Sequence, residues 1–176
     1  ADYFKLFSRR LNTTIKLYPT KTWSKTLEAV KNHDCDLVSL AKPSKKRSNY
    51  LNFTSPLLSF PYVIATKKDK FFIDNLEHEL DKTYTVVRDY VAVGELREKY
   101  PQLNLIEVST PAEGLQKVQS NEAFGYIGAT AVIAFTLHQN SMTDIKIAGQ
   151  LPWNFELGIA TRNDEPLLNT VFQKAA

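Results

Sequence analysis

The sequence predicts an α/β fold, and two patterns predict it. Segments with apolar residues at helical spacing alternate along the chain with short runs of strand-forming residues, which is typical of a sheet with crossover helices. The chain is also long enough to bury a core, because 43% of its 176 residues are hydrophobic and 11% are aromatic. We therefore expect one domain or two small lobes, without internal repeats or low-complexity segments.

The first third of the chain contributes helices and strands in turn. Residues 1–11 place apolar residues on one helical face, and the segment TTIKLY that follows alternates as a strand. A helix is expected over residues 23–32, capped by Thr22. Two more strands, DLVSL and FPYVIAT, lie on either side of a basic loop.

A second series begins after KKDKFF, where the character of the chain changes. Strands are expected at YTVV, LNLIEV and FGYIG, with helices over residues 91–100, over STPAEGLQKV and over TAVIAFTL. In STPAEGLQKV, Thr110 can cap, Pro111 can open the helix and Glu113 can bond back, which makes a capping box. The segment IKIAGQLPW then leads to a final strand, FELGIAT, and to a helix opened by NDEP.

Charge and hydropathy exclude several classes of protein. The net charge of +3, from 22 basic and 19 acidic residues, is too balanced for a nucleic-acid-binding protein. The longest apolar run is about six residues, whereas a membrane span needs about 20. The first residues do not have the charged-then-apolar pattern of a leader peptide, so we expect none in this sequence. We therefore expect a chain without a span of its own, for which anionic small molecules remain candidate partners.

Nothing in the sequence indicates a metal, a cofactor or catalysis. Cys35 is the single cysteine, so no internal disulfide forms, and its neighbours His33 and Asp34 do not have metal-ligand spacing. A small buried thiol is the expected role of Cys35. His33, His78 and His138 fall on separate helices or their ends and are expected at the surface. No phosphate loop or nucleophile elbow is present.

One arginine stands in a distinctive context. Arg47 lies six residues before the turn Phe-Thr-x-Pro, which leads into the strand FPYVIAT. One interpretation is a solvated basic loop, in which Arg47 and the neighbouring lysines face water. The other is an arginine held in place, because Phe53 and Pro56 would lock the loop by packing. The Phe-Thr-x-Pro context favours the second interpretation.

Five segments together resemble a known family. In order they are ADYFKLFSRRL, TWSKTLEAVKNHDCDLVSL, PSKKRSNYLNFTSPL, EVSTPAEGLQKVQSNEAFGYIGATAVI and IKIAGQLPWNFELGIATRNDEPLLNTVFQKA. They resemble the bacterial extracellular solute-binding proteins of family 3, the two-lobed Venus-flytrap domains. Within that family the chain is most similar to the periplasmic sensor domains of membrane-bound sensor histidine kinases.

The resemblance implies a two-lobed, periplasmic-binding-protein-like fold of type II. Lobe 1 would hold residues 1–67 and residues 151–176, and lobe 2 would hold residues 68–150. Two hinge crossings, near residues 66–69 and 149–154, would let the lobes close on each other. The first strand of lobe 1, whose loop supplies an aromatic wall of the pocket, and the last helices of that lobe would lie outside this sequence.

The resemblance also implies a set of ligand-binding residues in lobe 1. The arginine at the position of Arg47 forks onto a ligand carboxylate, for which a planar guanidinium is well suited. Trp23 would stack on the ligand, although a core position on its helix face is an equal alternative. Ser39 and Leu40 end the strand where the family meets the ligand's head group, and Lys42 replaces a small hydroxyl residue.

Lobe 2 departs from the family's amino-acid binders. Those proteins place a hydroxyl residue after the first lobe-2 strand and an acid after the YIG strand, where they receive the ligand's ammonium. This chain has Val91, Ala92 and Ala129 there. An unpaired ammonium in a closed cleft would cost several kcal/mol, so a standard α-amino-acid pose is not expected. Asp89 or Tyr90 could take the place of the acid.

These residues lead to one functional hypothesis with two alternatives. We expect a periplasmic sensor domain of a two-component signalling protein, which binds a carboxylate-bearing solute between its lobes and signals by lobe closure. Membrane attachment, any kinase or cyclase activity and a dimer would involve the full-length protein. The alternatives are a free receptor of an amino-acid-type ABC transporter, and an enzyme of the same fold in which Glu156 is the only candidate acid.

Overall fold

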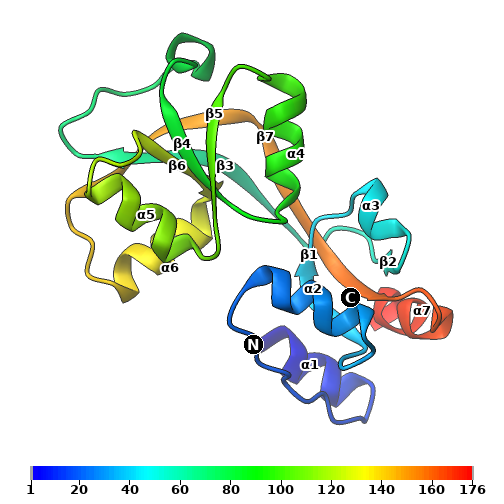
Figure 1. Ribbon diagram of the computed structural model, residues 1–176. Helices are drawn as coiled ribbons and strands as arrows, with labels where there is room; N and C mark the ends of the chain where they lie inside the picture. The colour runs from blue at the N-terminus through cyan, green and yellow to red at the C-terminus, as the bar shows by residue number, and fades with distance from the viewer. Residues whose placement is uncertain (1, 176) are drawn as a thin grey trace. The chain divides into compact units, whose positions relative to one another are not determined.

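The computed structural model of the chain describes residues 2–175, which fall into two compact units (Figure 1). Unit 1 comprises the described residues up to Lys21, Lys25–Ser59, and the chain from Glu156 onward. Unit 2 comprises Thr22–Ser24 and Phe60–Phe155. The mixture of strands and helices in both units confirms the predicted α/β class.

Unit 1 is organised around the second part of one long strand, β7. Its elements are α1 (Asp2–Arg10), α2 (Trp23–Lys31, whose first two residues are grouped with unit 2), β1 (Leu37–Ala41), α3 (Lys45–Ser48), β2 (Leu51–Phe53), the end of β7 (Ile145–Arg162) and α7 (Pro166–Ala175). Both β1 and β2 pair antiparallel with β7. Phe7 of α1 and Phe172 of α7 meet edge to face, with ring centroids 5.7 Å apart, in a core that also contains Ile159.

Unit 2 is a mixed sheet with helices on both faces. Its elements are β3 (Leu58–Lys67, grouped with unit 2 from Phe60), the 3₁₀ turn η1 (Leu76–Glu79), β4 (Thr83–Val87), α4 (Val91–Lys99), β5 (Asn104–Val108), α5 (Pro111–Gln119), β6 (Gly125–Ala129), α6 (Thr130–Gln139) and the first part of β7. The strand order is β7-β3-β6-β4-β5. Strands β5, β4 and β6 run parallel, and β3 is antiparallel to β6.

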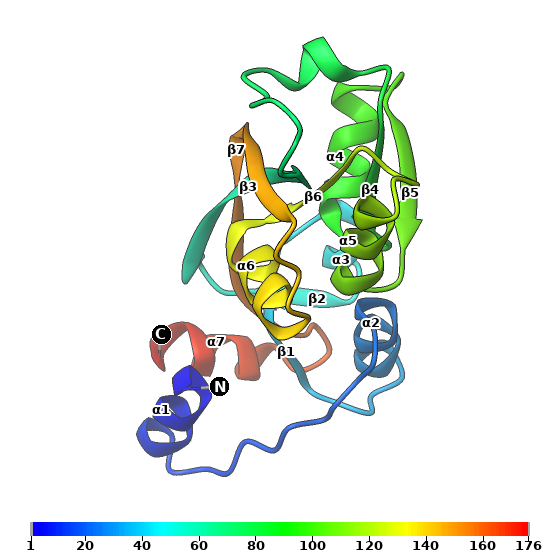
Figure 2. The ribbon, with the colours of Figure 1, turned by 90° about the vertical axis from the view of Figure 1, so that its left-hand side faces the viewer.

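The sheet of unit 2 separates two hydrophobic cores. Helix α4 covers one face and helices α5 and α6 cover the other (Figures 1 and 2). Consecutive residues of a strand point to opposite faces, so Tyr126 enters the core under α5 while Ile127 enters the core under α4. Because β4 and β6 are covered on both faces, their consecutive residues are buried and do not alternate with exposed ones.

The start of α5 confirms the capping prediction with one difference. The Thr110 hydroxyl accepts a hydrogen bond from the N–H of Glu113 at 3.2 Å, and Pro111 is the first helical residue. The Glu113 carboxylate accepts a hydrogen bond at 2.8 Å from the N–H of Ser109, the residue before the cap. Two backbone donors at the helix start are thereby satisfied, which is the physical purpose of a capping box.

Other predictions from the sequence need correction. The segment TTIKLY forms no strand, and Leu17 within it is 89% exposed. An alternating pattern makes a strand only where a neighbouring strand pairs with it, and no pairing involves these residues in the described structure. The crossing expected at residues 149–154 falls within β7, which runs unbroken from Ile145 to Arg162, and its role as a hinge stays a prediction.

The compact units divide at Phe60 and Glu156, whereas the lobe boundaries at 67 and 151 stay a prediction. Residues 62–66 pair with β6, and this pairing places β3 from Phe60 onward in unit 2. Leu151, Trp153 and Phe155 pack in the core under α4, so the chain returns to unit 1 only at Glu156. The division into units thus depends on backbone pairing and core packing. A change in composition along the sequence reveals neither of these.

We expect two glycine substitutions to have opposite effects on stability. In Gly158→Ala the new methyl would lie 2.7 Å from the backbone oxygen of Thr54, and the strain should lower the free energy of unfolding by about 1–3 kcal/mol. In Gly94→Ala, within α4, the methyl meets nothing within 4 Å, and stability should rise by about 0.5–1 kcal/mol. Urea unfolding midpoints of the two variants measure this, and equal midpoints would contradict the packing described for β7.

Candidate functional site

Arg47 is packed into its loop and does not extend into water. Helix α3 is a single turn, in which the Ser44 hydroxyl accepts a hydrogen bond from the backbone N–H of Arg47 at 3.3 Å. The Arg47 residue is 4% exposed, and its Nη1 donates to the Lys42 carbonyl at 2.6 Å. A guanidinium anchored in this way is pre-organised. The burial contradicts the solvated-loop interpretation, whereas the ligand-binding role of Arg47 stays a prediction.

The turn after Arg47 is locked by a threonine. Thr54 is buried, its hydroxyl accepts from the N–H of Ile159 and donates to the carbonyl of Ser55, each at 3.0 Å, and its own N–H donates to the Ile159 carbonyl. The sequence interpretation gave the locking role to Phe53 and Pro56. Pro56 is exposed, so the lock comes mainly from hydrogen bonds between Thr54 and β7.

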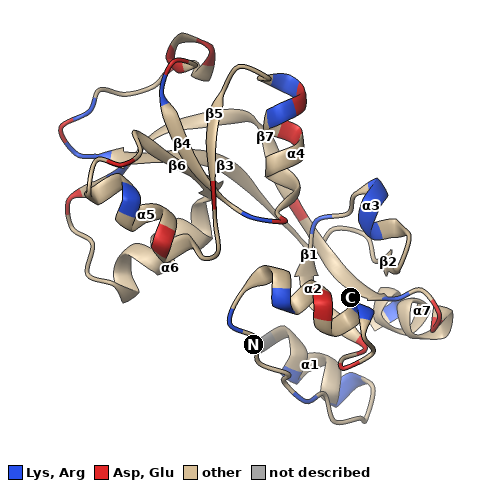
Figure 3. Cartoon of the chain, viewed as in Figure 1, with Lys and Arg blue, Asp and Glu red and all other residues tan. Residues whose placement is uncertain are grey.

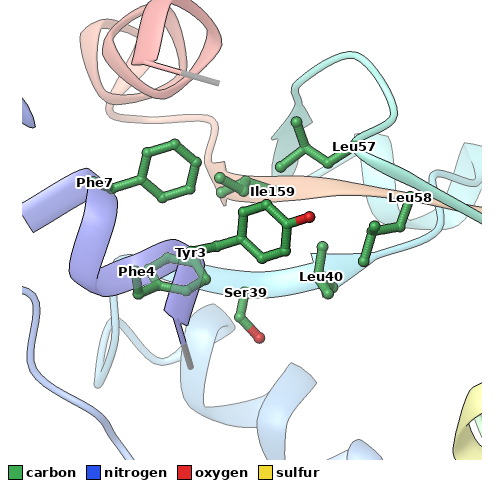
Figure 4. Close-up of a pocket in the computed structure, with 8 residues that line it drawn as sticks. All are labelled: Tyr3, Phe4, Phe7, Ser39, Leu40, Leu57, Leu58 and Ile159. Atoms are coloured by element: carbon green, nitrogen blue, oxygen red, sulfur yellow. The ribbon is translucent and has the colours of Figure 1, made fainter.

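Ser39 and Leu40 line a small apolar hollow in unit 1. The hollow has a volume of about 70 Å³, and helix α1 closes it with Tyr3, Phe4 and Phe7 (Figure 4). Its other lining residues are Leu57, Leu58 and Ile159. Neither Lys42 nor Arg47 is among the lining residues. Since a carboxylate placed here would lack a cationic partner, the hollow does not suit an anion.

The predicted residues of unit 2 gather at one edge of its sheet. Tyr90, Val91 and Ala92 follow β4, and Ala129 ends β6, at the carboxyl ends of parallel strands where α/β sheets usually bind ligands. Ala92 and Ala129 are 3% and 5% exposed. Their side chains therefore belong to the unit's packing, and the backbone is the part of these residues that could meet a ligand.

Trp23 contacts the loop after β4. Its indole Nε1 donates to the Asp89 carbonyl at 3.2 Å, and its ring meets Tyr90 edge to face with centroids 5.7 Å apart. The Ser24 hydroxyl donates to the Asp89 carboxylate at 2.6 Å. Asp89 has a positive φ of 63°, a backbone conformation that side-chain hydrogen bonding helps an aspartate to adopt. The Asp89 carboxylate is thus engaged locally.

Tyr126 is a candidate that the sequence analysis missed. It is completely buried on β6, and its hydroxyl has no hydrogen-bond partner within the described part of the chain. The hydroxyl oxygen lies 3.0 Å from the point where a side chain on Gly128 would begin, near the carboxyl end of β6. Burial, and to a smaller extent Tyr90, raises the pKa of Tyr126, so the hydroxyl stays neutral. A buried neutral donor without a partner is unusual and is a candidate for binding a ligand or a water molecule.

Two glycines, Gly114 and Gly128, are the sequence feature that could have pointed to Tyr126. A methyl on Gly114 or Gly128 would lie 2.6 Å from the tyrosine ring. Gly114 is inside helix α5, where glycine has no local advantage, and a large side chain packed against it explains its presence.

The other titratable residues singled out in the sequence are exposed or half-buried. Within residues 2–175, no group of three or more His, Cys, Asp and Glu side chains could hold a metal ion. His33, His78 and His138 are exposed, as expected, and so is Glu156. Cys35 is half-buried, and burial together with Asp36 and Asp34 raises the pKa of its thiol. The described residues also include no helix long and apolar enough to cross a membrane.

The sequence model of the bacterial extracellular solute-binding proteins, family 3, matches residues 1–175. The chain belongs to this family. It is therefore a member of a class of solute-binding domains and not of enzymes. Its fold is that of the Venus-flytrap, periplasmic-binding-protein-like domains, as the solved structures below show.

Curated relatives are sensor proteins of Bordetella. The virulence sensor protein BvgS of Bordetella pertussis is 20% identical over 176 residues, and BvgS of Bordetella bronchiseptica has the same identity. The match covers 99% of this chain but only 14% of either relative. The chain thus spans a small part of the sensor proteins it matches.

Solved structures have the same fold at low sequence identity. The periplasmic VFT2 domain of B. pertussis BvgS superposes with a TM-score of 0.87 at 20% identity, over 97% of this chain and 73% of that one. A histidine kinase sensor domain with similarity to periplasmic binding proteins gives 0.89 at 19% identity, over 99% and 76%. Arginine-bound, truncated ArgBP from T. maritima gives 0.85 at 19% identity, over 99% and 81%.

Substituting the orphaned tyrosine should stabilise the protein. Tyr126→Phe removes a buried hydroxyl whose missing hydrogen bond costs about 1–3 kcal/mol, so the melting temperature without ligand should rise or stay level. The matched control is Tyr84→Phe. Tyr84 is equally buried, but its hydroxyl donates to the Glu79 carbonyl, and its loss should lower the melting temperature. A fall for Tyr126→Phe equal to that of the control would show that a partner satisfies its hydroxyl.

Proposed function

We propose that this chain is the ligand-binding region of a periplasmic sensor domain in a membrane-bound two-component signalling protein. The observation that carries the proposal is the match of 99% of the chain to BvgS, a sensor protein. The similarity to a histidine kinase sensor domain, at a TM-score of 0.89, supports it. Membrane attachment, the output domain and any dimer would involve parts of the protein outside this chain.

The proposed mechanism is closure of two lobes on a ligand. The lobes are those proposed from the sequence, residues 1–67 with 151–176 and residues 68–150, and the two crossings near residues 66–69 and 149–154 would act as the hinge. A ligand that binds both lobes favours the closed state only by its difference in affinity for the two states. The signal would therefore depend on contacts made by both lobes.

We propose a carboxylate as the ligand's anchored group. Arg47 supports this, because its guanidinium is buried and oriented by the Lys42 carbonyl. Buried arginines of this kind suit carboxylates, which they bind through two parallel hydrogen bonds. As the resemblance implies, Trp23, Ser39, Leu40 and Lys42 would contribute further contacts to the ligand.

The rest of the ligand is proposed to be apolar or neutral. In unit 2 the expected ammonium-binding positions are Val91, Ala92 and Ala129, which carry no charge. Tyr90 adds a hydroxyl group near the same sheet edge, and Tyr126 adds a buried, neutral one. A neutral hydroxyl can bond a neutral polar tail, whereas a buried ammonium would need a carboxylate partner.

A free transport receptor is the second candidate function. It is favoured by the similarity to ArgBP, whose arginine-bound form superposes at a TM-score of 0.85. The full reading frame distinguishes the two candidates. A transmembrane helix and a kinase region after this domain would support sensing, whereas a leader peptide before it and a stop codon after it would support transport.

A ligand panel tests the proposed chemistry. In a thermal-shift assay on a chain that includes the flanking segments, a ligand at about 100 times its Kd stabilises the bound state by about 2.7 kcal/mol. We expect raised melting temperatures with simple carboxylates such as propionate or benzoate. Large shifts with arginine and other α-amino acids, and none with simple carboxylates, would show that lobe 2 accepts an ammonium after all.

Arg47 should be indispensable for binding the carboxylate that gives the largest shift. Arg47→Ala is expected to weaken its binding by about 2–5 kcal/mol, since the variant loses a desolvated charge pair. Arg47→Lys should recover little, because an ammonium cannot form the two parallel bonds. Lys46→Ala, an exposed lysine on the same turn, is the control and should bind nearly normally. Titration calorimetry measures all three, and an unchanged affinity in Arg47→Ala rejects the proposed anchor.

A further inference from the structure

The loop after β3 presents two phenylalanines to solvent. Phe71 and Phe72 are 92% and 72% exposed. Three lysines precede them in the same loop, and a fourth, Lys146 of β7, donates its ammonium to the Lys70 carbonyl at 2.5 Å. We call this surface the Phe-Lys loop, and it consists of Lys67, Lys68, Lys70, Phe71, Phe72 and Lys146.

The Phe-Lys loop is held at both ends by β7 and the segment before it. At its start the N–H of Lys68 donates to the Asp144 carbonyl at 2.8 Å, and at its end the N–H of Ile73 donates to the Ala148 carbonyl at 2.7 Å. Ile73 also forms a parallel bridge with Gly149. A methyl group on Gly149 would lie 2.7 Å from the Ile73 carbonyl oxygen, so glycine is needed for this close approach. The exposure of the two rings is therefore imposed by a fixed backbone.

The charge of the loop is positive. Within residues 67–73 the one acidic residue is Asp69, and its carboxylate is paired with the ammonium of Lys70 at 3.2 Å. The Lys67 ammonium donates to the neutral side chain of Asn121, so its charge is not cancelled by that contact. Figure 3 shows the basic residues of this loop beyond the end of β3.

We propose that the Phe-Lys loop binds the surface of a membrane that contains anionic lipids. Aromatic rings favour the boundary between head groups and acyl chains, and lysines beside them contact lipid phosphates. Two adjacent exposed rings with four lysines combine both contributions. A lysine can also keep its charge at the phosphates while its methylene stem follows the rings toward the apolar layer. The proposal is independent of which ligand the domain binds.

The composition of the loop favours a bilayer over a protein partner. Two aromatic side chains bury about 300–500 Å² at most, whereas a stable protein interface needs about 800 Å² from each partner. Lysine is also depleted in protein interfaces. A bilayer demands no matching shape, and anionic head groups gain from each nearby lysine.

Vesicle flotation tests the proposal. The chain is mixed with vesicles of phosphatidylcholine alone or of phosphatidylcholine with phosphatidylglycerol, and the bound fraction is measured at low and high salt. We expect binding to the anionic vesicles that weakens as salt rises. The double variant Phe71→Ser, Phe72→Ser should bind at least about tenfold more weakly, and Lys68→Ser about fivefold more weakly.

A control on the other unit separates this loop from general stickiness. Leu167→Ser removes a side chain of α7 that is 77% exposed, and its vesicle binding should equal that of the original chain. Melting temperatures should be unchanged in all variants, because the substituted side chains lie at the surface. The proposal fails if the original chain does not float with anionic vesicles or if the double variant binds equally well. It also fails if the loop instead mediates self-association, seen as a concentration-dependent dimer in lipid-free buffer that the double variant loses.

Discussion

Backbone pairing along β7 is the constraint on which both units depend. Its last part pairs with β1 and β2 and forms the centre of the unit 1 sheet. Its first part neighbours β3 in the sheet of unit 2. Main-chain hydrogen bonds are obligatory for a buried strand, so segments far apart in the sequence take their places from this one strand. The Thr54 hydrogen bonds to Ile159 extend the same constraint to the turn that follows Arg47.

The candidate site illustrates how burial changes the chemistry of a side chain. In unit 1 a basic loop holds Arg47 nearly completely buried, with its guanidinium on a backbone carbonyl. In unit 2 the edge of the sheet after β4 and β6 contains Tyr90, Val91, Ala92 and Ala129. A binding domain with a cationic residue on one side of its site and neutral residues on the other would select an anion. The cationic residue compensates the desolvation of the anion, and the neutral residues do not.

Membrane contact would add a second function to a rigid part of unit 2. The bridge between Ile73 and Gly149 ties the Phe-Lys loop to β7, so the loop's position relative to that strand is constrained. If such a loop rests on a bilayer, the orientation of unit 2 at the membrane surface is constrained as well.

Local patterns in the sequence determined the α/β class, most helices and strands, and the position of the arginine before Phe-Thr-x-Pro. They succeeded at α5 because its capping residues act within one helical turn. Tertiary structure decided the rest. TTIKLY has the alternation of a strand but no paired neighbour in the described part of the chain, and Pro56 remains exposed while Thr54 makes the lock. The orphaned hydroxyl of Tyr126 is likewise invisible in sequence, since both strand pairing and burial depend on residues distant along the chain.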